Sequence, residues 1–257
     1  MNIVLLGAGN VATVLAKMAT ARGHHVLQIF SRNPINAAEL AEAVSAEPVT
    51  DLKNIRTDAD LYVAALTDTA VASLHQHLNL SRGVLVHTAG ALNMEVLEPA
   101  APNYGVLYPI QSLRKEKSDY SPFPWLTQAS TPETLAFITD FAETLSPTVK
   151  PSSNAERLHL HLAAVVANNF TNHLYALTQQ FCKQHQVSFD LLKPLIVETA
   201  LRIDEFDPYA VQTGPALRHD ADTISKHLEL LRQNPQLEQL YHALSNSIAK
   251  MHEPRGK

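Results

Sequence analysis

The sequence predicts an α/β protein in which a doubly wound, Rossmann-like parallel sheet is followed by an all-helical C-terminal domain. Two observations predict this fold. From residue 1 to about residue 150, short apolar runs alternate with segments of helical periodicity, as in a parallel sheet that helices cover. Beyond that point strand-like runs disappear, and apolar residues recur at spacings of three and four almost to the C-terminus. We therefore expect a nucleotide-binding domain at 1–152 and a helical domain at 153–257.

The first domain is expected to alternate strands and helices along the chain. Buried strands are expected at 2–7, 24–30, 59–68, 83–90, 104–110 and 123–130. Helices are expected at 10–23, 34–44, 69–78 and 131–145, where apolar residues return with the helical period. Gly23 closes the first helix. Pro34 stands in the first turn of the second, where its missing N–H leaves no helical bond unmade.

The second domain is expected to consist of long helices. They are placed at 153–185, 188–206 and 220–251, the last one interrupted at Asn234-Pro235. An apolar stripe for packing is formed by Ile224, Leu228, Leu231, Leu237, Leu240, Leu244, Ile248 and Met251.

The composition argues against several classes of protein. The 257 residues are 46% hydrophobic and 18% charged, with a formal net charge of −5. No run of basic residues could follow a phosphate backbone, so nucleic acid is not expected as a partner. No stretch of about twenty apolar residues could span a membrane. Cys182 is the only cysteine, and "MNIVLLGAG" has no secretory signal, so we expect a cytoplasmic protein.

A glycine-rich turn follows the first predicted strand. "VLLGAGNVA" contains the G-x-G-x-x-A form of the dinucleotide fingerprint: Gly7 permits the tight turn, Gly9 lets the backbone approach a pyrophosphate, and Ala12 packs on the sheet. Asn10 and Val11 begin the helix whose free N–H groups would hold that pyrophosphate. The alternative is a glycine-rich turn in a Rossmann-like domain that binds no nucleotide.

The stretch from Ser31 to Asn33 directly follows the second predicted strand, where an NAD enzyme usually offers a carboxylate to the ribose hydroxyls. No acidic residue occurs between Gly23 and Glu39. A carboxylate would repel the 2′-phosphate of NADP, whereas the guanidinium of Arg32 can bind it bidentately and stack on adenine. The sequence therefore predicts NADP as the cofactor, and it disfavours a methyltransferase. A solvated surface arginine is the alternative.

Polar residues lie at the carboxyl ends of two further predicted strands. Thr67 is near the end of one of them, and His87 and Thr88 are near the end of the next. Because the carboxyl ends of the strands in an open α/β sheet border the ligand crevice, these residues are expected near the ribose or the nicotinamide. The alternative is an ordinary turn at each strand end.

The segment from Leu158 to Cys182 contains no Asp, Glu, Lys or Arg, which predicts a helix buried on most sides. At about 100° per residue, one side is apolar and carries Ala163, Val166, Phe170, Leu174, Leu177 and Phe181. The opposite side carries Asn154, Arg157, His161, Asn168, Asn172, Tyr175 and Gln179.

Three residues of this polar side are candidates for catalysis. If the side faces the nucleotide domain, His161, Asn168 and Asn172 would line the cleft where nicotinamide meets substrate. Asn168 could hold a carbonyl or an amine, and His161 could donate the proton that accompanies hydride delivery. Alternatively, the polar side chains only cap or pack within a helical dimer interface.

Several stretches resemble a family of bacterial oxidoreductases that join a Rossmann-like N-terminal domain to a helical C-terminal domain of unknown function. The N-terminal domain of that family is related to the deazaflavin-dependent NADP reductases and to pyrroline-5-carboxylate reductase. The stretches that carry the resemblance are "LLGAGNVA", "VHTAG", "YPIQSL", "HLAAVVANNFTNHLYAL", "LKPLIVETA" and "QTGPALRHDADTISKHLELL". The resemblance implies an NADP-linked dehydrogenase or reductase that forms a homodimer through its helical domain.

One departure from related hydroxyacid dehydrogenases is evident. Those enzymes use a lysine four residues before an asparagine on this helix, but Ala164 and Val165 precede Asn168 and Asn169 here. In "TGPALRHD", Arg218 could bind an anionic group of the substrate. A turn and helix cap is the alternative for that stretch.

Other kinds of chemistry lack their sequence signals. No H-E-x-x-H or paired-cysteine metal site, phosphate-binding G-K-[ST] loop or nucleophile elbow occurs, so no metal is expected. The sequence thus predicts an NADP-dependent oxidoreductase acting on a small carbonyl or imine compound, ketopantoate being the first to test. The alternative is a non-catalytic NADPH sensor or scaffold that acts through its helical domain.

Overall fold

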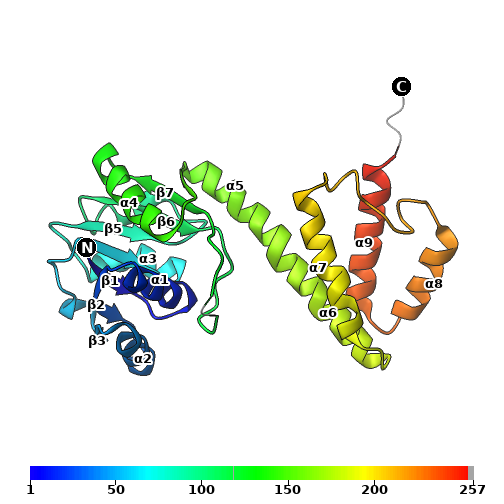
Figure 1. Ribbon diagram of the computed structural model, residues 1–257, viewed down its shortest axis with the longest axis horizontal. Helices are drawn as coiled ribbons and strands as arrows, with labels where there is room; N and C mark the ends of the chain where they lie inside the picture. The colour runs from blue at the N-terminus through cyan, green and yellow to red at the C-terminus, as the bar shows by residue number, and fades with distance from the viewer. Residues whose placement is uncertain (118, 254–257) are drawn as a thin grey trace. The chain divides into compact units, whose positions relative to one another are not determined.

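The computed structural model describes residues 1–117 and 119–253, and it divides into two compact units, Met1–Asn168 and Asn169–Lys257 (Figure 1). The first unit contains the α/β sheet, and the second is helical. The predicted fold class is confirmed. The units divide later than residue 152 because the first turns of the helix that begins at Asn154 pack against the sheet.

An eight-stranded sheet with the order β3-β2-β1-β4-β5-β6-β7-β8 forms the first unit. The strands β1 to β6 run parallel, β7 is antiparallel to β6, and β8 is parallel to β7. Their bounds are β1 Asn2–Leu6, β2 His25–Phe30, β3 Glu47–Val49, β4 Leu61–Ala64, β5 Val84–His87, β6 Tyr104–Pro109, β7 Trp125–Ala129 and β8 Val149–Pro151.

Two short strands, β3 and β8, were missed by the sequence pattern. Both are three residues long and contain a proline, Pro48 in β3 and Pro151 in β8. Proline is tolerated in a sheet chiefly on an edge strand, because it cannot donate a ladder hydrogen bond. Both strands are indeed the edges of the sheet, and their pairing comes from neighbouring strands rather than from an apolar run of their own.

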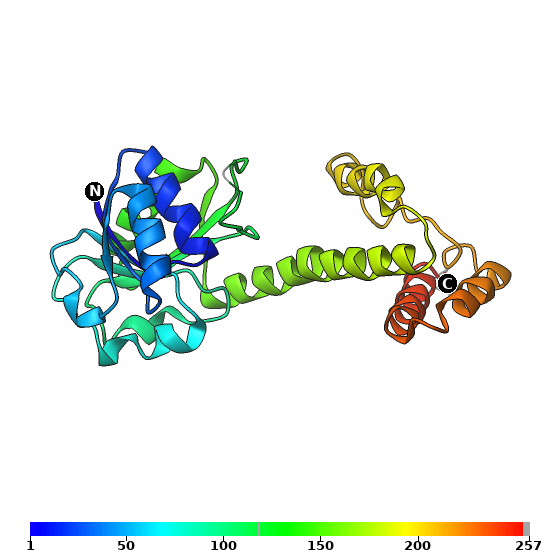
Figure 2. The same ribbon diagram turned by 90° about the horizontal axis from the view of Figure 1, so that it is seen from below.

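Both faces of the sheet are covered. The helices of the unit are α1 Asn10–Ala21, α2 Pro34–Val44, α3 Asp68–Ala72 and α4 Pro132–Leu145, and each lies within or beside a segment predicted from the sequence. Because side chains alternate along a strand, Ile3 and Leu5 of β1 join a core with α1, α2 and α4, whereas Val4 and Leu6 join a second core with α3. Figure 2 shows α1 and α2 on one side of the sheet and the turns around α3 on the other.

The remaining helices are α5 Asn154–Ala164, α6 Thr171–Gln184, α7 Lys193–Leu201, α8 Ala221–Leu231 and α9 Pro235–Met251. A π-helical turn, Val165–Phe170, joins α5 to α6. Ser153 and Glu156 form a capping box at the start of α5. Asp220 caps α8 by accepting from the N–H of Thr223 at 3.1 Å, so "TGPALRHD" contains the turn and cap that was the alternative interpretation.

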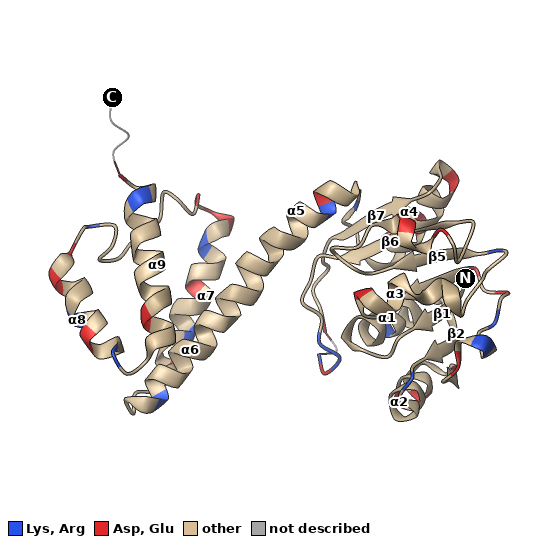
Figure 3. Ribbon diagram, turned by 180° about the vertical axis from the view of Figure 1, so that it is seen from behind, with Lys and Arg blue, Asp and Glu red and all other residues tan. Residues whose placement is uncertain are grey.

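The expected burial of the uncharged segment was wrong. Leu162, Val166 and Phe170 are 60%, 52% and 57% exposed, although Leu177 is buried. Figure 3 shows this helical segment without blue or red from the second turn of α5 to the last turn of α6. The absence of charged residues indicated a helix surface that is unfavourable in water. It could not show whether residues of this same chain bury that surface.

Within the described residues, no helix is both long enough and apolar enough to cross a membrane. No group of three or more His, Cys, Asp or Glu side chains in the same part of the chain could hold a metal ion.

Candidate coenzyme site and active site

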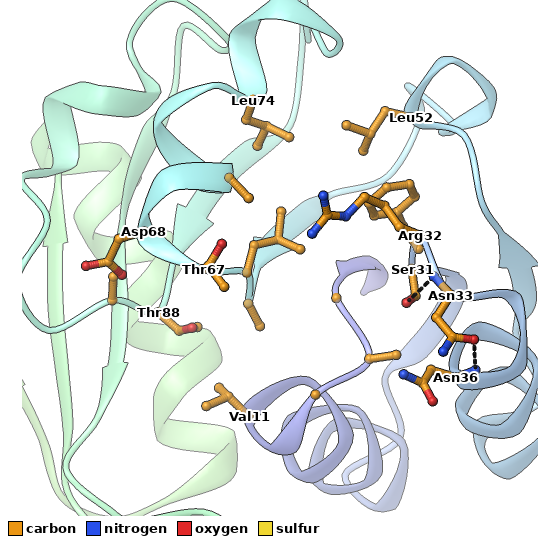
Figure 4. Close-up of a pocket in the computed structure, with 18 of the residues that line it drawn as sticks. Val11, Ser31, Arg32, Asn33, Asn36, Leu52, Thr67, Asp68, Leu74 and Thr88 are labelled. Atoms are coloured by element: carbon orange, nitrogen blue, oxygen red, sulfur yellow. Dashed lines mark hydrogen bonds between the residues drawn. The ribbon is translucent and has the colours of Figure 1, made fainter.

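A cavity of about 800 Å³ lies at the carboxyl ends of β1, β2, β4 and β5 (Figure 4). Strand order reverses between β1 and β4, which is the switch point where open α/β sheets bind ligands. Nearly all residues predicted to bind the coenzyme line this cavity: Gly7, Gly9, Asn10, Val11, Ser31, Arg32, Asn33, Thr67 and Thr88.

The glycine turn has the geometry that its sequence requires. Gly7 has φ +130°, and a Cβ there would lie 2.3 Å from the carbonyl oxygen of Ala65, so no other residue fits without a shift of the backbone. A Cβ on Gly9 would meet nothing within 4 Å, because it would point into open space. The two glycines therefore serve different purposes: the first closes the turn, and the second leaves its outer side open.

The N-terminus of α1 is prepared for an anion. Gly9 is its N-cap and provides no side-chain cap, and the first turn has no acidic residue. The N–H groups of that turn and the positive end of the helix dipole together favour a phosphate group. The side chain of Asn10 is already engaged, because its Oδ1 accepts from the N–H of Lys115 at 3.1 Å.

Arg32 is exposed, and its guanidinium extends into the cavity (Figure 4). It has no ion-pair or hydrogen-bond partner within 1–117 and 119–253. The neighbouring oxygens are occupied: Ser31 Oγ accepts from the N–H of Asn33 at 3.2 Å, and Asn33 Oδ1 caps α2 by accepting from Ile35 at 3.0 Å. The Ser31 hydroxyl and the Asn33 amide can still donate. With no acid in the first turn of α2, these donors suit a phosphate rather than a ribose diol.

His87 lies apart from the other predicted coenzyme residues. Its side chain is fully buried and does not line the cavity, whereas the next residues, Thr88 and Ala89, do. Its Nδ1 accepts from the N–H of Ala89 at 3.1 Å, so this ring shapes the strand end. Burial, reinforced by the nearby charge of Arg157, lowers the pKa of His87 to about 4 and keeps the ring neutral.

His161 is half-buried and lies beside the same strand end. Its Nδ1 is 3.0 Å from the hydroxyl of Tyr108 on β6, and the two rings are edge-to-face. A Cβ on Gly90 would lie only 2.5 Å from this Nδ1, so the imidazole rests directly on the backbone that follows Thr88 and Ala89. His161 is thus next to the cavity lining, although it is not part of it.

The other predicted site residues are more dispersed. Asn168 is exposed in the π-helical turn of the first unit. Asn172 is exposed in α6, and Arg218 is exposed in the turn before α8, both in the second unit. A π-helical turn changes the angle between the residues that flank it, so the common polar line expected at a constant 100° per residue does not hold across it.

Sequence reasoning did not single out some residues of the cavity, namely Asn36, Leu52, Asp68, Leu74 and His77. Asp68 directly follows Thr67 and could have been included for that reason. The others come from a helix and from 3-10 turns. Only the tertiary structure determines which side of these elements faces the cavity. Tyr108 lay in the stretch "YPIQSL", but nothing in that stretch indicated its partner.

Comparison with known proteins identifies the family. The protein family described as NADP oxidoreductase, coenzyme F420-dependent, matches residues 2–90. The family DUF2520, a domain of unknown function, matches residues 123–248. A crystal structure from Bacteroides fragilis, described as an NADP oxidoreductase, is 42% identical over 97% of this chain and 98% of that chain, with a TM-score of 0.92. This chain belongs to the NADP oxidoreductase family. It is an NADP-dependent oxidoreductase, and the predicted cofactor and family are confirmed.

More distant structures share the fold. A Thermotoga maritima protein is 20% identical, with a TM-score of 0.80 over 98% of this chain and 100% of that one. The 1-pyrroline-5-carboxylate reductase of Streptococcus pyogenes is 11% identical, with a TM-score of 0.66 over 97% of this chain and 98% of that one. None of the curated proteins matches the sequence.

Proposed function

We propose that this NADP oxidoreductase reduces a small carbonyl or imine compound, with His161 supplying the proton. The observation that carries the proposal is the contact between the His161 ring and Gly90, the residue that follows the cavity-lining Thr88 and Ala89. An imidazole at that point is close enough to the end of the cavity to reach a substrate there.

The residues at the two ends of the cavity indicate the orientation in which NADPH would bind. Arg32, after β2, provides the positive charge for the 2′-phosphate on the adenosine half. The nicotinamide half would then extend toward Thr67 and Thr88, after β4 and β5, where His161 is nearest. Bound NADPH supplies a hydride. The chain holds the coenzyme, and His161 gives a proton to the substrate oxygen or nitrogen on which negative charge develops.

Asn168 is proposed to hold the polar atom of the substrate, because an exposed amide offers both a donor and an acceptor. The lysine that related hydroxyacid dehydrogenases use is absent from this helix. The proton must therefore come from another group, which favours His161.

The first experiment measures NADPH oxidation against a panel of 2-oxo acids, beginning with ketopantoate, and of cyclic imines. His161→Gln is expected to lower kcat by about 10² to 10⁴ and to leave the Kd of NADPH unchanged. His159→Gln is the matched control, because His159 lies on the same helix, is exposed and should not contribute. Full turnover by His161→Gln would exclude the proton role. Tight NADPH binding without oxidation of any compound would favour the sensor function instead.

We also propose that the helical unit joins two copies of this chain. Its large apolar side chains are exposed to an unusual degree, Leu191 by 79% and Leu195, Leu201 and Phe206 each by more than half. Monomers seldom expose so many large apolar side chains in one helical unit to water. Light scattering after gel filtration should give a dimer, and Leu195→Glu should raise its Kd by about tenfold or more. A monomeric wild-type protein at micromolar concentration would refute this.

A further inference from the structure

We propose that Tyr108 is a proton-relay residue that acts through His161: it passes its hydroxyl proton to His161 Nδ1 while His161 Nε2 gives its proton to the substrate. Buried Arg157 holds the helix in position for this transfer. The inference rests on the proposed proton role of His161 and identifies the group behind it. It is carried by the contacts of Arg157, Gly90 and Tyr108.

Arg157 fixes the first turns of α5 against the sheet. Its side chain is 1% exposed, its Nη1 donates to Oε1 of Gln128 on β7 at 2.5 Å, and its Nη2 donates to Oδ1 of Asn154 at 2.8 Å and to the carbonyl of Leu92. In the described part of the chain no carboxylate forms an ion pair with it. Burying a cation is unfavourable, and the hydrogen bonds partly offset this cost. They join α5 to β7 and to the segment after β5.

His161 lies one helical turn beyond Arg157, on the same face of α5. The anchored helix therefore brings the imidazole down on Gly90, where a Cβ would also lie 2.6 Å from its Cγ. Gly90 has no left-handed backbone conformation that would require glycine, so its lack of a side chain matters here for space alone.

Tyr108 selects the tautomer of His161. The Tyr108 residue is 9% exposed, and His161 Nδ1 is the only hydrogen-bond partner of its hydroxyl among the described residues. If Nδ1 carried the proton, the tyrosine O–H would be left without an acceptor. A hydroxyl donor that loses its acceptor in a largely buried residue is unfavourable. The O–H therefore donates to Nδ1, and the ring proton is on Nε2.

A neutral imidazole that loses its Nε2 proton alone would become a poor anion, and the relay avoids this. As the Nε2–H bond breaks and the substrate O–H or N–H bond forms, the O–H bond of Tyr108 breaks and an Nδ1–H bond forms on His161. The negative charge then rests on the tyrosinate, near the Arg157 cation. After turnover, solvent protonates Nε2 of the half-buried His161, and the Nδ1 proton returns to the tyrosinate.

The charged surroundings agree with this direction. Burial raises the pKa of Tyr108, and the charge of Arg157 opposes that rise. The other titratable groups around the cluster are His87, which is neutral, and Glu95, whose charge acts on Arg157. The tyrosine thus keeps its proton at neutral pH and gives it up only as His161 transfers its Nε2 proton to the substrate.

Two experiments on the full-length protein test the relay. In ¹⁵N NMR spectra of the NADP-saturated protein, one imidazole should show an Nδ1 acceptor and a protonated Nε2, and His161→Gln should remove that signal. Tyr108→Phe should abolish the tautomer preference, and Gly90→Ala should also perturb it. Tyr104→Phe, a change on the same strand in a hydroxyl without a hydrogen bond among the described residues, should not. An unchanged His161 signal in Tyr108→Phe would overturn the inference.

The second experiment uses whichever compound the panel identifies as substrate. Tyr108→Phe should lower kcat by at least tenfold with little change in KM. It should also change the pH profile of kcat, because the hydroxyl of Tyr108 no longer replaces the proton that His161 gives to the substrate. If His161→Gln is impaired while Tyr108→Phe keeps the wild-type profile, only the relay fails. If both variants are fully active, the proton role of His161 fails as well.

Discussion

Replacement of Arg32 by alanine tests the electrostatic basis of coenzyme choice. The guanidinium extends into the cavity without a protein partner among the described residues, so its removal breaks no internal contact (Figure 4). A charge-assisted hydrogen bond contributes roughly 1.5–3 kcal/mol, which corresponds to about ten- to a hundredfold in affinity. We expect Arg32→Ala to weaken NADPH by that factor and to leave NADH nearly unchanged.

The assay is a fluorescence titration of both coenzymes against wild type, Arg32→Ala and Arg22→Ala. Arg22 follows α1 and does not line the cavity, so it controls for a general loss of positive charge. The preference of the wild type for NADPH should also decline with added salt, because both charges are accessible to solvent. Equal affinities for the two coenzymes in the wild type, or an equal loss of both in Arg32→Ala, would refute the reasoning.

Three further predictions follow from local geometry. Gly7→Ala should lower stability, because its Cβ would meet the carbonyl of Ala65, whereas Gly9→Ala should keep the stability and lose NADPH affinity; thermal melts and titrations separate the two. The pKa of His87 is lowered to about 4, against 6.5 in the unfolded chain. Between these two values the unfolded chain binds more protons than the folded chain, so the free energy of unfolding decreases as the pH is lowered. Urea unfolding should show a loss of about 2 kcal/mol from pH 7 to pH 5 that is absent in His87→Gln. Asp220→Ala should cost about 1 kcal/mol, measured in the same way, through loss of the cap of α8.

The glycine turn and the arginine could be predicted because their chemistry is local. A turn that needs Gly7, a helix that starts at Asn10 and a basic residue beyond the next strand are separated by few residues, and the βαβ unit brings them together wherever it forms. The helix starting at Pro34 was also predicted with its observed bounds, since proline and the periodic apolar residues both mark it.

The helical segment after residue 153 was less predictable, for two physical reasons. A π-helical turn at Val165–Phe170 changes the direction of every side chain after it, and no residue type announces such a turn. The apolar surface from Leu162 to Phe170 is also exposed in this chain, because periodicity reports which side avoids water but not what covers it.

The sequence by itself determined the fold class, the coenzyme and most of the cavity that would hold it. These depend on the glycines of one turn and on the charge of one arginine, and all of these residues lie within one βαβ unit. Only the tertiary structure decided that His87 is enclosed in the sheet, and that His161 rests on Gly90 with Tyr108 as its partner. Those contacts join β5, β6 and α5, and the last of these is remote in sequence from the strands. No local pattern sets the distance between such elements, because packing of Arg157 against the sheet fixes it.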